Sequence, residues 1–401
     1  MKPRALSERA LLVLLAAVTA TGPAALSIYM PVVPLARDAF GVSVAAASTT
    51  VTAPLVAFAI GLFVYGPLSD HYGRRPMILA GLAIFIVGST LALTSTSIGA
   101  LTIGRVVSAL GTSAGVTVAR AAMGDLYARD RMAHRLATLT MVMVTANSLA
   151  PAGGGAIAEA LGWRAVFGVL LAAGLVIGAL AWRYLPETRV GAGTSHPREM
   201  LGATLALVRE PRFLALAFQG AVIYAVFLVF VALVPYVFHS LGRSPAEYGL
   251  WYLGISGGYF AGNWVVSRYT YTLGVQRLMR AGIALQAAAA AAGWALALAG
   301  LWHPFWLFAP WTVIGFAQGL ALPNLTASAV ALAPGNAGAA SGLLGFTQQI
   351  LGALAVQLMA VTSTATPLPV TAFVAVTAAV ALVALRLGPG PVSQAHPPGA
   401  G

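Results

Sequence analysis

The chain is dominated by apolar stretches that are each long enough to cross a lipid bilayer. Twelve occur, near residues 11–33, 46–67, 77–97, 99–120, 136–158, 164–185, 213–238, 246–267, 278–300, 304–330, 339–362 and 367–387. A helix needs about 20 apolar residues to span the hydrocarbon core, and a backbone polar group without a partner in lipid is costly. The sequence therefore predicts an all-α membrane protein with twelve transmembrane helices.

The composition excludes a soluble protein of this length. Only 8% of the residues are charged and 59% are hydrophobic, whereas a water-facing surface needs about a quarter of its residues charged. The net charge of +12 might suggest a nucleic-acid partner, but the basic residues form small groups between the apolar stretches. Basic cytoplasmic loops give the same total, so we expect no nucleic-acid binding. The absence of cysteine excludes disulfides and thiolate metal sites.

The basic residues also predict the orientation, because positively charged loops stay in the cytoplasm. With the amino terminus inside, eighteen of the 22 basic residues fall in inner segments. Only Arg37, Arg164 and Arg243 fall in outer segments, and Arg105 lies within a stretch. We therefore expect a multi-pass protein of the bacterial cytoplasmic membrane with both termini inside.

A polar segment near residues 186–212 divides the stretches into six and six. We predict an amino-terminal bundle over 1–190, a cytoplasmic linker over 191–212, a carboxy-terminal bundle over 213–390 and a flexible tail over 391–401. A weak repeat supports the division: Gly73 and Gly81 recur 201 positions later as Gly274 and Gly282. Coincidence in a glycine-rich chain is the alternative.

The most specific motif lies in the turn after the second stretch, Gly66-Pro-Leu-Ser-Asp70-His-Tyr-Gly73-Arg74-Arg75. It resembles the hallmark motif of the major facilitator superfamily, which implies two pseudo-symmetric six-helix bundles around a central cavity. The resemblance also implies a latch in which Asp70 and Arg74 hold the halves together on the cytoplasmic side. Asp125 is placed to pair with Arg74. An ordinary basic loop is the alternative.

Three further segments follow the order of this superfamily. Ile103-Gly104-Arg105 places an arginine inside the fourth stretch, as in the antiporters of the superfamily. Ala150-Pro151-Ala-Gly153-Gly154-Gly155 resembles the exporter motif of the fifth helix, in which Pro151, Gly154 and Gly155 permit bending and tight packing. Pro186-Glu187-Thr188 closes the sixth stretch.

Residues 27–34, Ser-Ile-Tyr-Met-Pro-Val-Val-Pro, resemble a segment of the bicyclomycin and chloramphenicol resistance exporters. The resemblance implies drug export with the proton as coupling ion and without a cofactor. Those exporters carry a buried aspartate where this chain has Ser27, which cannot titrate. All ten carboxylates of the chain lie in loops or near predicted helix ends, so the usual proton route is missing.

Arg105 is the leading candidate for substrate binding, because an unpaired charge at the bilayer centre costs at least about 2.5–3.5 kcal/mol. Its alternative is a guanidinium that backbone carbonyls satisfy. Helical spacing and side-chain chemistry add further candidates, namely Thr19, Ser27, Met30, Ser108, Asn147, Tyr224 and Phe227. Polar residues inside the stretches, such as Gln348 and Gln357, are more often interhelical hydrogen bonds than ligand contacts.

The sequence contains one motif that resembles an enzymatic site, but the residues needed for catalysis are missing. Gly111-Thr-Ser113-Ala-Gly115 has the spacing of a serine nucleophile, but none of the six histidines lies in the core of a predicted helix. We therefore expect a monomeric exporter of small amphipathic molecules, with no enzymatic activity and no metal. A uniporter or importer of a defined, possibly anionic, metabolite is one alternative, and a membrane sensor or scaffold without transport is another.

Overall fold

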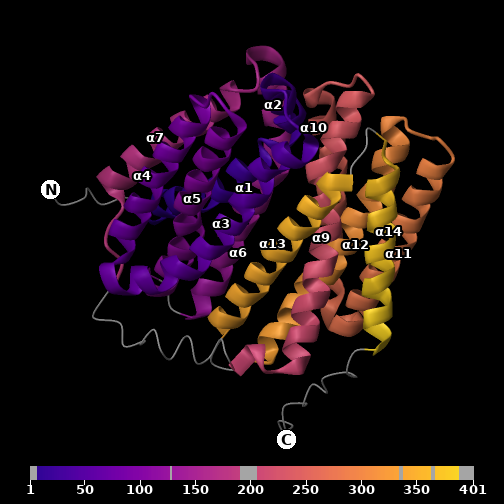
Figure 1. The fold of residues 1–401 in the computed structure, drawn as a ribbon. Helices are drawn as coiled ribbons and strands as arrows, with labels where there is room; N and C mark the ends of the chain where they lie inside the picture. The colour runs from indigo at the N-terminus through magenta and orange to yellow at the C-terminus, as the bar shows by residue number, and fades with distance from the viewer. Residues whose placement is uncertain (1–6, 127–128, 190–205, 334–336, 363–365, 388–401) are drawn as a thin grey trace, which may run out of the picture.

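The computed structural model describes residues 7–126, 129–189, 206–333, 337–362 and 366–387, and all the regular structure in these ranges is helical (Figure 1). The helices are α1 (Glu8–Ser27), η1 (Met30–Val32), α2 (Val33–Phe40), α3 (Val44–Tyr72), α4 (Arg74–Leu93), α5 (Ile98–Leu126), α6 (Arg129–Leu161), α7 (Ala165–Tyr184), α9 (Pro211–Ser240), α10 (Pro245–Leu273), α11 (Val275–Leu298), α12 (Pro304–Ala331), α13 (Ala337–Thr362) and α14 (Leu368–Leu387). Each predicted stretch falls on one of these helices, and the first continues through η1 into α2. The predicted twelve-helix membrane fold is confirmed.

Ten segments of the described chain are both long and apolar enough to cross a membrane. Two helices of the fold fall short. α14 is apolar over the shorter segment Leu368–Val383, and α10 is diluted by its many glycine and tyrosine residues. Within their bundle, α10 packs against α12 and α14 packs against α11.

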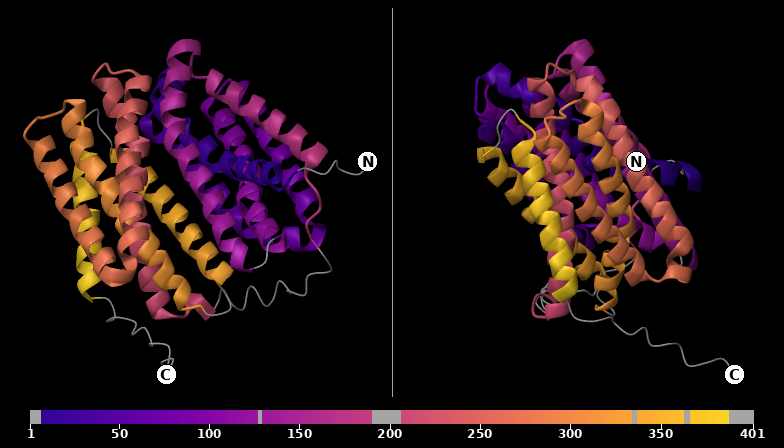
Figure 2. Two further views of the ribbon diagram at one scale, coloured as in Figure 1. Left: turned by 180° about the vertical axis from the view of Figure 1, so that it is seen from behind. Right: turned by 90° about the vertical axis from the view of Figure 1, so that its right-hand side faces the viewer.

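The helices form two bundles, α1 to α7 and α9 to α14, which stand side by side (Figures 1 and 2). The predicted linker lies mostly outside the described residues, as does the tail over 391–401, and the domain boundaries stay predictions. Within each bundle, glycines bring helix backbones together, because a Cβ added there would lie 2.2–2.7 Å from a backbone atom of the partner helix. These glycines are Gly81, Gly88, Gly104 and Gly111 between α4 and α5, and Gly258, Gly262, Gly315 and Gly319 between α10 and α12.

The glycine repeat seen in the sequence corresponds to a repeated turn. Gly73 joins α3 to α4 with φ 97° and ψ 159°, and Gly274 joins α10 to α11 with φ 82° and ψ 145°. Only glycine adopts this region of backbone conformation readily. The second and eighth membrane helices therefore end in the same way, as expected for two related halves.

The two bundles contact each other at the end that the arginine pattern predicts to be outer. Gly155 of α6 lies against Pro245 at the start of α10. Gln357 of α13 accepts a hydrogen bond from Thr52 of α3 (3.1 Å). The Asp38 carboxylate of α2 lies 2.6 Å from His239 of α9. These contacts close the outer end of the space between the bundles.

Candidate functional site

A cavity of about 170 Å³ lies between the two bundles. Five of the predicted substrate-binding residues line it, namely Ser27, Met30, Asn147, Tyr224 and Phe227. The other lining residues are Pro23, Leu26, Leu55, Phe58, Met143, Val144, Leu228, Val231, Tyr252 and Gln349. Both bundles contribute side chains, so a molecule in the cavity would contact both halves of the protein.

The cavity has a polar side and an aromatic side. On the polar side, the Ser27 hydroxyl of α1 donates a hydrogen bond to Oδ1 of Asn147 of α6 (2.5 Å). On the aromatic side, the Tyr224 and Phe227 rings of α9 lie 6.1 Å apart, and Phe227 lies 6.4 Å from Tyr252 of α10. None of the lining residues is an acid, a lysine, an arginine or a histidine.

Arg105 lies inside the first bundle, outside the lining of this cavity. Its side chain is 4% exposed, and its Nε donates a hydrogen bond to the carbonyl of Thr50 (2.6 Å). In a regular helix that carbonyl accepts a bond from residue 54, but residue 54 is a proline and has no N–H. The guanidinium therefore replaces a backbone donor that Pro54 removes from α3.

An aromatic ring completes the surroundings of Arg105. The guanidinium carbon lies 4.0 Å from the centroid of the Tyr29 ring, and the Tyr29 hydroxyl accepts a hydrogen bond from Thr50 (3.1 Å). A cation over an aromatic face is attracted by its π electrons, most strongly when both are desolvated. These contacts match the alternative in which Arg105 is satisfied within the protein.

Two other candidates also lie outside the central cavity. Ser108 is buried beside Arg105 in a separate small pocket of the first bundle. Thr19 is buried and donates its hydroxyl proton to the carbonyl of Leu15, one turn earlier in α1 (2.8 Å). Neither residue is positioned to contact a molecule held between the bundles in this structure.

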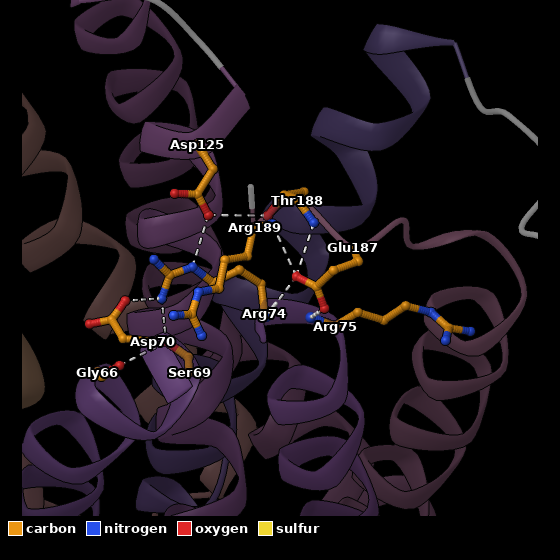
Figure 3. A network of polar contacts seen from close by, with 9 residues as sticks. All are labelled: Gly66, Ser69, Asp70, Arg74, Arg75, Asp125, Glu187, Thr188 and Arg189. Atoms are coloured by element: carbon orange, nitrogen blue, oxygen red, sulfur yellow. Dashed lines mark hydrogen bonds and ion pairs between the residues drawn. The ribbon is translucent and has the colours of Figure 1, made fainter. Parts of the chain in front are cut away.

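The hallmark motif forms a polar network centred on Arg74 (Figure 3). The Arg74 guanidinium contacts the carboxylates of Asp70 (2.6 Å) and Asp125 (2.8 Å). It also donates to the Ser69 hydroxyl (2.6 Å), which in turn donates to the carbonyl of Gly66 (2.9 Å). Because Arg74 is largely buried, these charge-assisted bonds are stronger than the same bonds in water.

Glu187 extends the network to the start of α4. Its carboxylate accepts the backbone N–H groups of Arg74 (2.9 Å) and Arg75 (3.2 Å), and Arg75 donates through Nη2 to the carbonyl of Trp182 (2.7 Å). The first N–H groups of a helix have no partner within the helix, and a negative charge there is favoured by the helix dipole. Glu187 therefore caps α4, and a Cβ added at Gly73 would lie only 2.6 Å from Glu187.

The described contacts of this network join α3, α4, α5 and the segment after α7 (Figure 3). All of these belong to the first bundle. The structure thus shows how the motif fastens the adjacent helix ends of that bundle together. A contact from Asp70 to the second bundle is not among those of the described residues.

A comparison with known protein families agrees with both the motif and the fold. A model of the family described as the Major Facilitator Superfamily matches residues 15–356, which include the motif around Asp70 and Arg74. This chain belongs to the major facilitator superfamily. The relatives named below are transporters rather than enzymes, which agrees with the prediction for this chain.

Curated relatives of this major facilitator protein have names from antibiotic resistance. It is 35% identical to Multidrug resistance protein D of Escherichia coli (strain K12) over 182 residues, which is 45% of either chain. It is 28% identical over 348 residues to the Bicyclomycin resistance protein homolog of Haemophilus influenzae, covering 84% of this chain and 85% of the relative. It is 35% identical over 167 residues to the Chloramphenicol resistance protein of Pseudomonas aeruginosa, covering 41% of this chain and 40% of the relative. The predicted resemblance to drug exporters of the bicyclomycin and chloramphenicol resistance type is confirmed.

The fold is shared with solved major facilitator structures. A bacterial homolog of the human lysosomal transporter Spinster, in an inward-facing and occupied conformation, superimposes with a TM-score of 0.77. The alignment covers 95% of this chain and 96% of that chain at 17% identity, so the likeness concerns the fold.

The exporter motif of this major facilitator protein lies where α6 meets other helices. A Cβ added at Gly154 would collide with the carbonyl of Ile28 between α1 and η1, and one at Gly155 with the carbonyl of Pro245. Pro151 lies inside α6, which continues to Leu161. The two glycines thus allow α6 to approach both its own bundle and the opposite one.

Sequence reasoning missed several residues of these sites. In the network, Ser69 and Thr188 make hydrogen bonds that were not expected. Glu187 was seen as part of a motif, but its capping role depends on the position of α4. In the cavity, Gln349 was not singled out, whereas the adjacent Gln348 was.

Proposed function

We propose that this protein is a secondary transporter that exports small amphipathic molecules from the bacterial cytoplasm by alternating access. The observation that carries the proposal is the cavity shared by both bundles, with an aromatic side and a polar side. Rocking of two related bundles about a central site exposes that site to one face of the membrane at a time. In this proposal both termini are cytoplasmic.

Two observations support export in particular. The proline and glycines of α6 follow the exporter pattern, and Gly155 lies at the contact between the bundles. A relative that covers most of the chain is named for bicyclomycin resistance, and one that covers part of it is named for chloramphenicol resistance. Amphipathic molecules also match a lining that is mostly apolar with a few polar groups.

Export against a gradient needs a coupled ion, and we propose the proton. The cavity lining contains no carboxylate, so the proton-binding group lies elsewhere. Among the ion pairs of the described residues, the one between Asp38 and His239 joins the two bundles. A change in the protonation of this pair would alter the closure of the outer end.

The latch remains part of the proposal. In it, the Arg74 network keeps the cytoplasmic ends of the first bundle rigid, so that they can close against the second bundle as one body. The closed cytoplasmic state would then depend on Asp70 and Asp125 through their bonds to Arg74.

A flux assay in proteoliposomes tests the proposed function. Purified protein is reconstituted, chloramphenicol is supplied, and uptake is measured with and without an imposed pH gradient. We expect flux that requires the protein and rises several-fold when the gradient drives protons in the opposite direction. Flux that ignores the gradient would favour the uniporter alternative, and the absence of flux would remove export of this compound.

A further inference from the structure

Gln349 of α13 lines the cavity and has a buried side-chain oxygen that no hydrogen bond from the described part of the chain satisfies. Its side chain is 9% exposed, it lines the central cavity, and its Oε1 has no hydrogen-bond partner among the described residues. A buried carbonyl oxygen without a partner is unfavourable, so such an atom requires an explanation, and a bound ligand is one. Rotation about the last side-chain bond can turn this oxygen toward the cavity, because that torsion is soft.

Two of the other polar groups of the cavity are paired with each other. The Ser27 hydroxyl proton is donated to Oδ1 of Asn147, which occupies one donor and one acceptor. The unpaired oxygen of Gln349 is therefore an acceptor available to a donor group on a bound molecule. Hydroxyl and amide N–H groups are such donors.

The cavity also lacks a charge that could compensate a charged ligand. One cation contacts a lining residue: Nη2 of Arg120 of α5 lies 3.9 Å from Sδ of Met143. A cationic ligand would lose its hydration, find no carboxylate and approach a positive charge. An anionic ligand would also lose its hydration, and Arg120 is not itself among the residues that line the cavity.

The aromatic side of the cavity completes the description of the ligand. Tyr224, Phe227 and Tyr252 form a continuous series of rings, with neighbouring centroids 6.1 and 6.4 Å apart. Aromatic rings pack favourably against one another in offset or edge-on arrangements. A ligand with an aromatic ring would extend this series.

We propose that the cavity selects uncharged aromatic molecules that carry a hydroxyl or amide N–H group, and that Gln349 accepts the hydrogen bond from that group. This inference rests on the proposed function, because it takes the cavity as the transport site. Gln349 is thus a specificity-determining residue of the transporter.

Three probes on one scaffold test the preference for an uncharged ligand. They are chloramphenicol, its anionic hemisuccinate ester, and a cation in which a trimethylammonium group replaces the dichloroacetamide. Binding to the purified full-length protein is measured by calorimetry at neutral pH. We expect chloramphenicol to bind at least about ten-fold more tightly than either charged compound.

Variants of Gln349 test the hydrogen bond. In Gln349→Leu the acceptor is lost, and chloramphenicol binding should weaken by a factor of about 3 to 10, the contribution of one hydrogen bond. In Gln349→Glu the acceptor is kept and a carboxylate is added, so the preference should move toward the cation. This gain cannot arise from misfolding.

Gln286→Leu is the matched control. Gln286 of α11 is also buried, at 1% exposed, and both of its side-chain polar atoms lack a partner among the described residues, but it does not line the cavity. Its replacement should leave chloramphenicol binding unchanged.

The inference is overturned if a charged probe binds as tightly as chloramphenicol, if Gln349→Leu binds like the unmodified protein, or if chloramphenicol does not bind. Failure of the proposed function gives a different pattern. In that case the three probes and the variants bind as expected, but reconstituted vesicles show no flux.

Discussion

Pro54 and Arg105 illustrate how one residue can make another necessary. The proline leaves the carbonyl of Thr50 without its helical donor, and the buried guanidinium of Arg105 supplies a substitute. Arg105, which the sequence suggests as a substrate-binding residue, therefore links α5 to the backbone of α3.

A double-mutant cycle tests this link. Arg105→Leu should reduce the free energy of unfolding by about 1–3 kcal/mol, because it leaves a buried carbonyl unpaired. Pro54→Ala restores the N–H that this carbonyl lacks, so Arg105→Leu should cost less in the Pro54→Ala background. Thermal unfolding in detergent measures all four proteins. Additive effects would show that the bond to Thr50 is unimportant.

At the residue scale, Gly73 is constrained both by its backbone conformation and by the Glu187 side chain, whereas Gly274 is constrained by its backbone conformation alone. Both glycines have the same unusual backbone conformation, but only Gly73 faces a side chain, that of Glu187, and nothing lies within 4 Å of a Cβ added at Gly274. Gly274→Ala therefore reports on the backbone alone.

We expect Gly274→Ala to lower stability by about 1–3 kcal/mol through the backbone conformation. Gly73→Ala should lower it further, because the added methyl group displaces Glu187 from the start of α4. In a Glu187→Ala background the difference between the two glycine variants should shrink. Equal melting temperatures of Gly73→Ala and Gly274→Ala would contradict the capping role of Glu187.

At the scale of helices, hydropathy predicts each span but not the full length of its helix. The second stretch was expected over 46–67, whereas α3 runs from Val44 to Tyr72. The added turn contains the polar residues Ser69 and Asp70, which bind Arg74. Apolarity marks the part of a helix in lipid, while its end is fixed by caps and turns such as Gly73.

Helical spacing predicts a face of a helix but neither its rotation nor its depth. Spacing puts Ser27, Met30 and Thr19 on one face; Ser27 and Met30 line the cavity, whereas Thr19 bonds to its own backbone. Gln348 and Gln349 are neighbours in sequence, and only the packing of α13 against both bundles decides that Gln349 lines the cavity. That packing involves distant helices and cannot be read from the spacing.

At the scale of the whole molecule, the contact between α6 and α10 governs how the bundles meet. Gly155 touches the backbone of Pro245, and the nearby Gly153 has open space around it. The two positions share one helix and one residue type, which makes them a matched pair. The absence of cysteine in the chain allows a single introduced thiol to act as a reporter.

Gly155→Ala should force α6 and α10 apart and open the outer end of the cavity. A reporter cysteine at Val231, which lines the cavity, should then react faster with a membrane-impermeant maleimide added from outside. Export should fall several-fold, and Gly153→Ala should change neither quantity. If labelling rates are the same in both variants, the α6–α10 contact does not control the outer closure.

A cavity without charged groups has an electrical consequence for transport. A molecule that carries no charge exchanges no energy with the membrane potential when it crosses the bilayer. If one proton enters for each molecule exported, every cycle moves one positive charge inward, and a potential of 100 mV contributes about 2.3 kcal/mol. Export would then respond to voltage even when the pH is equal on both sides.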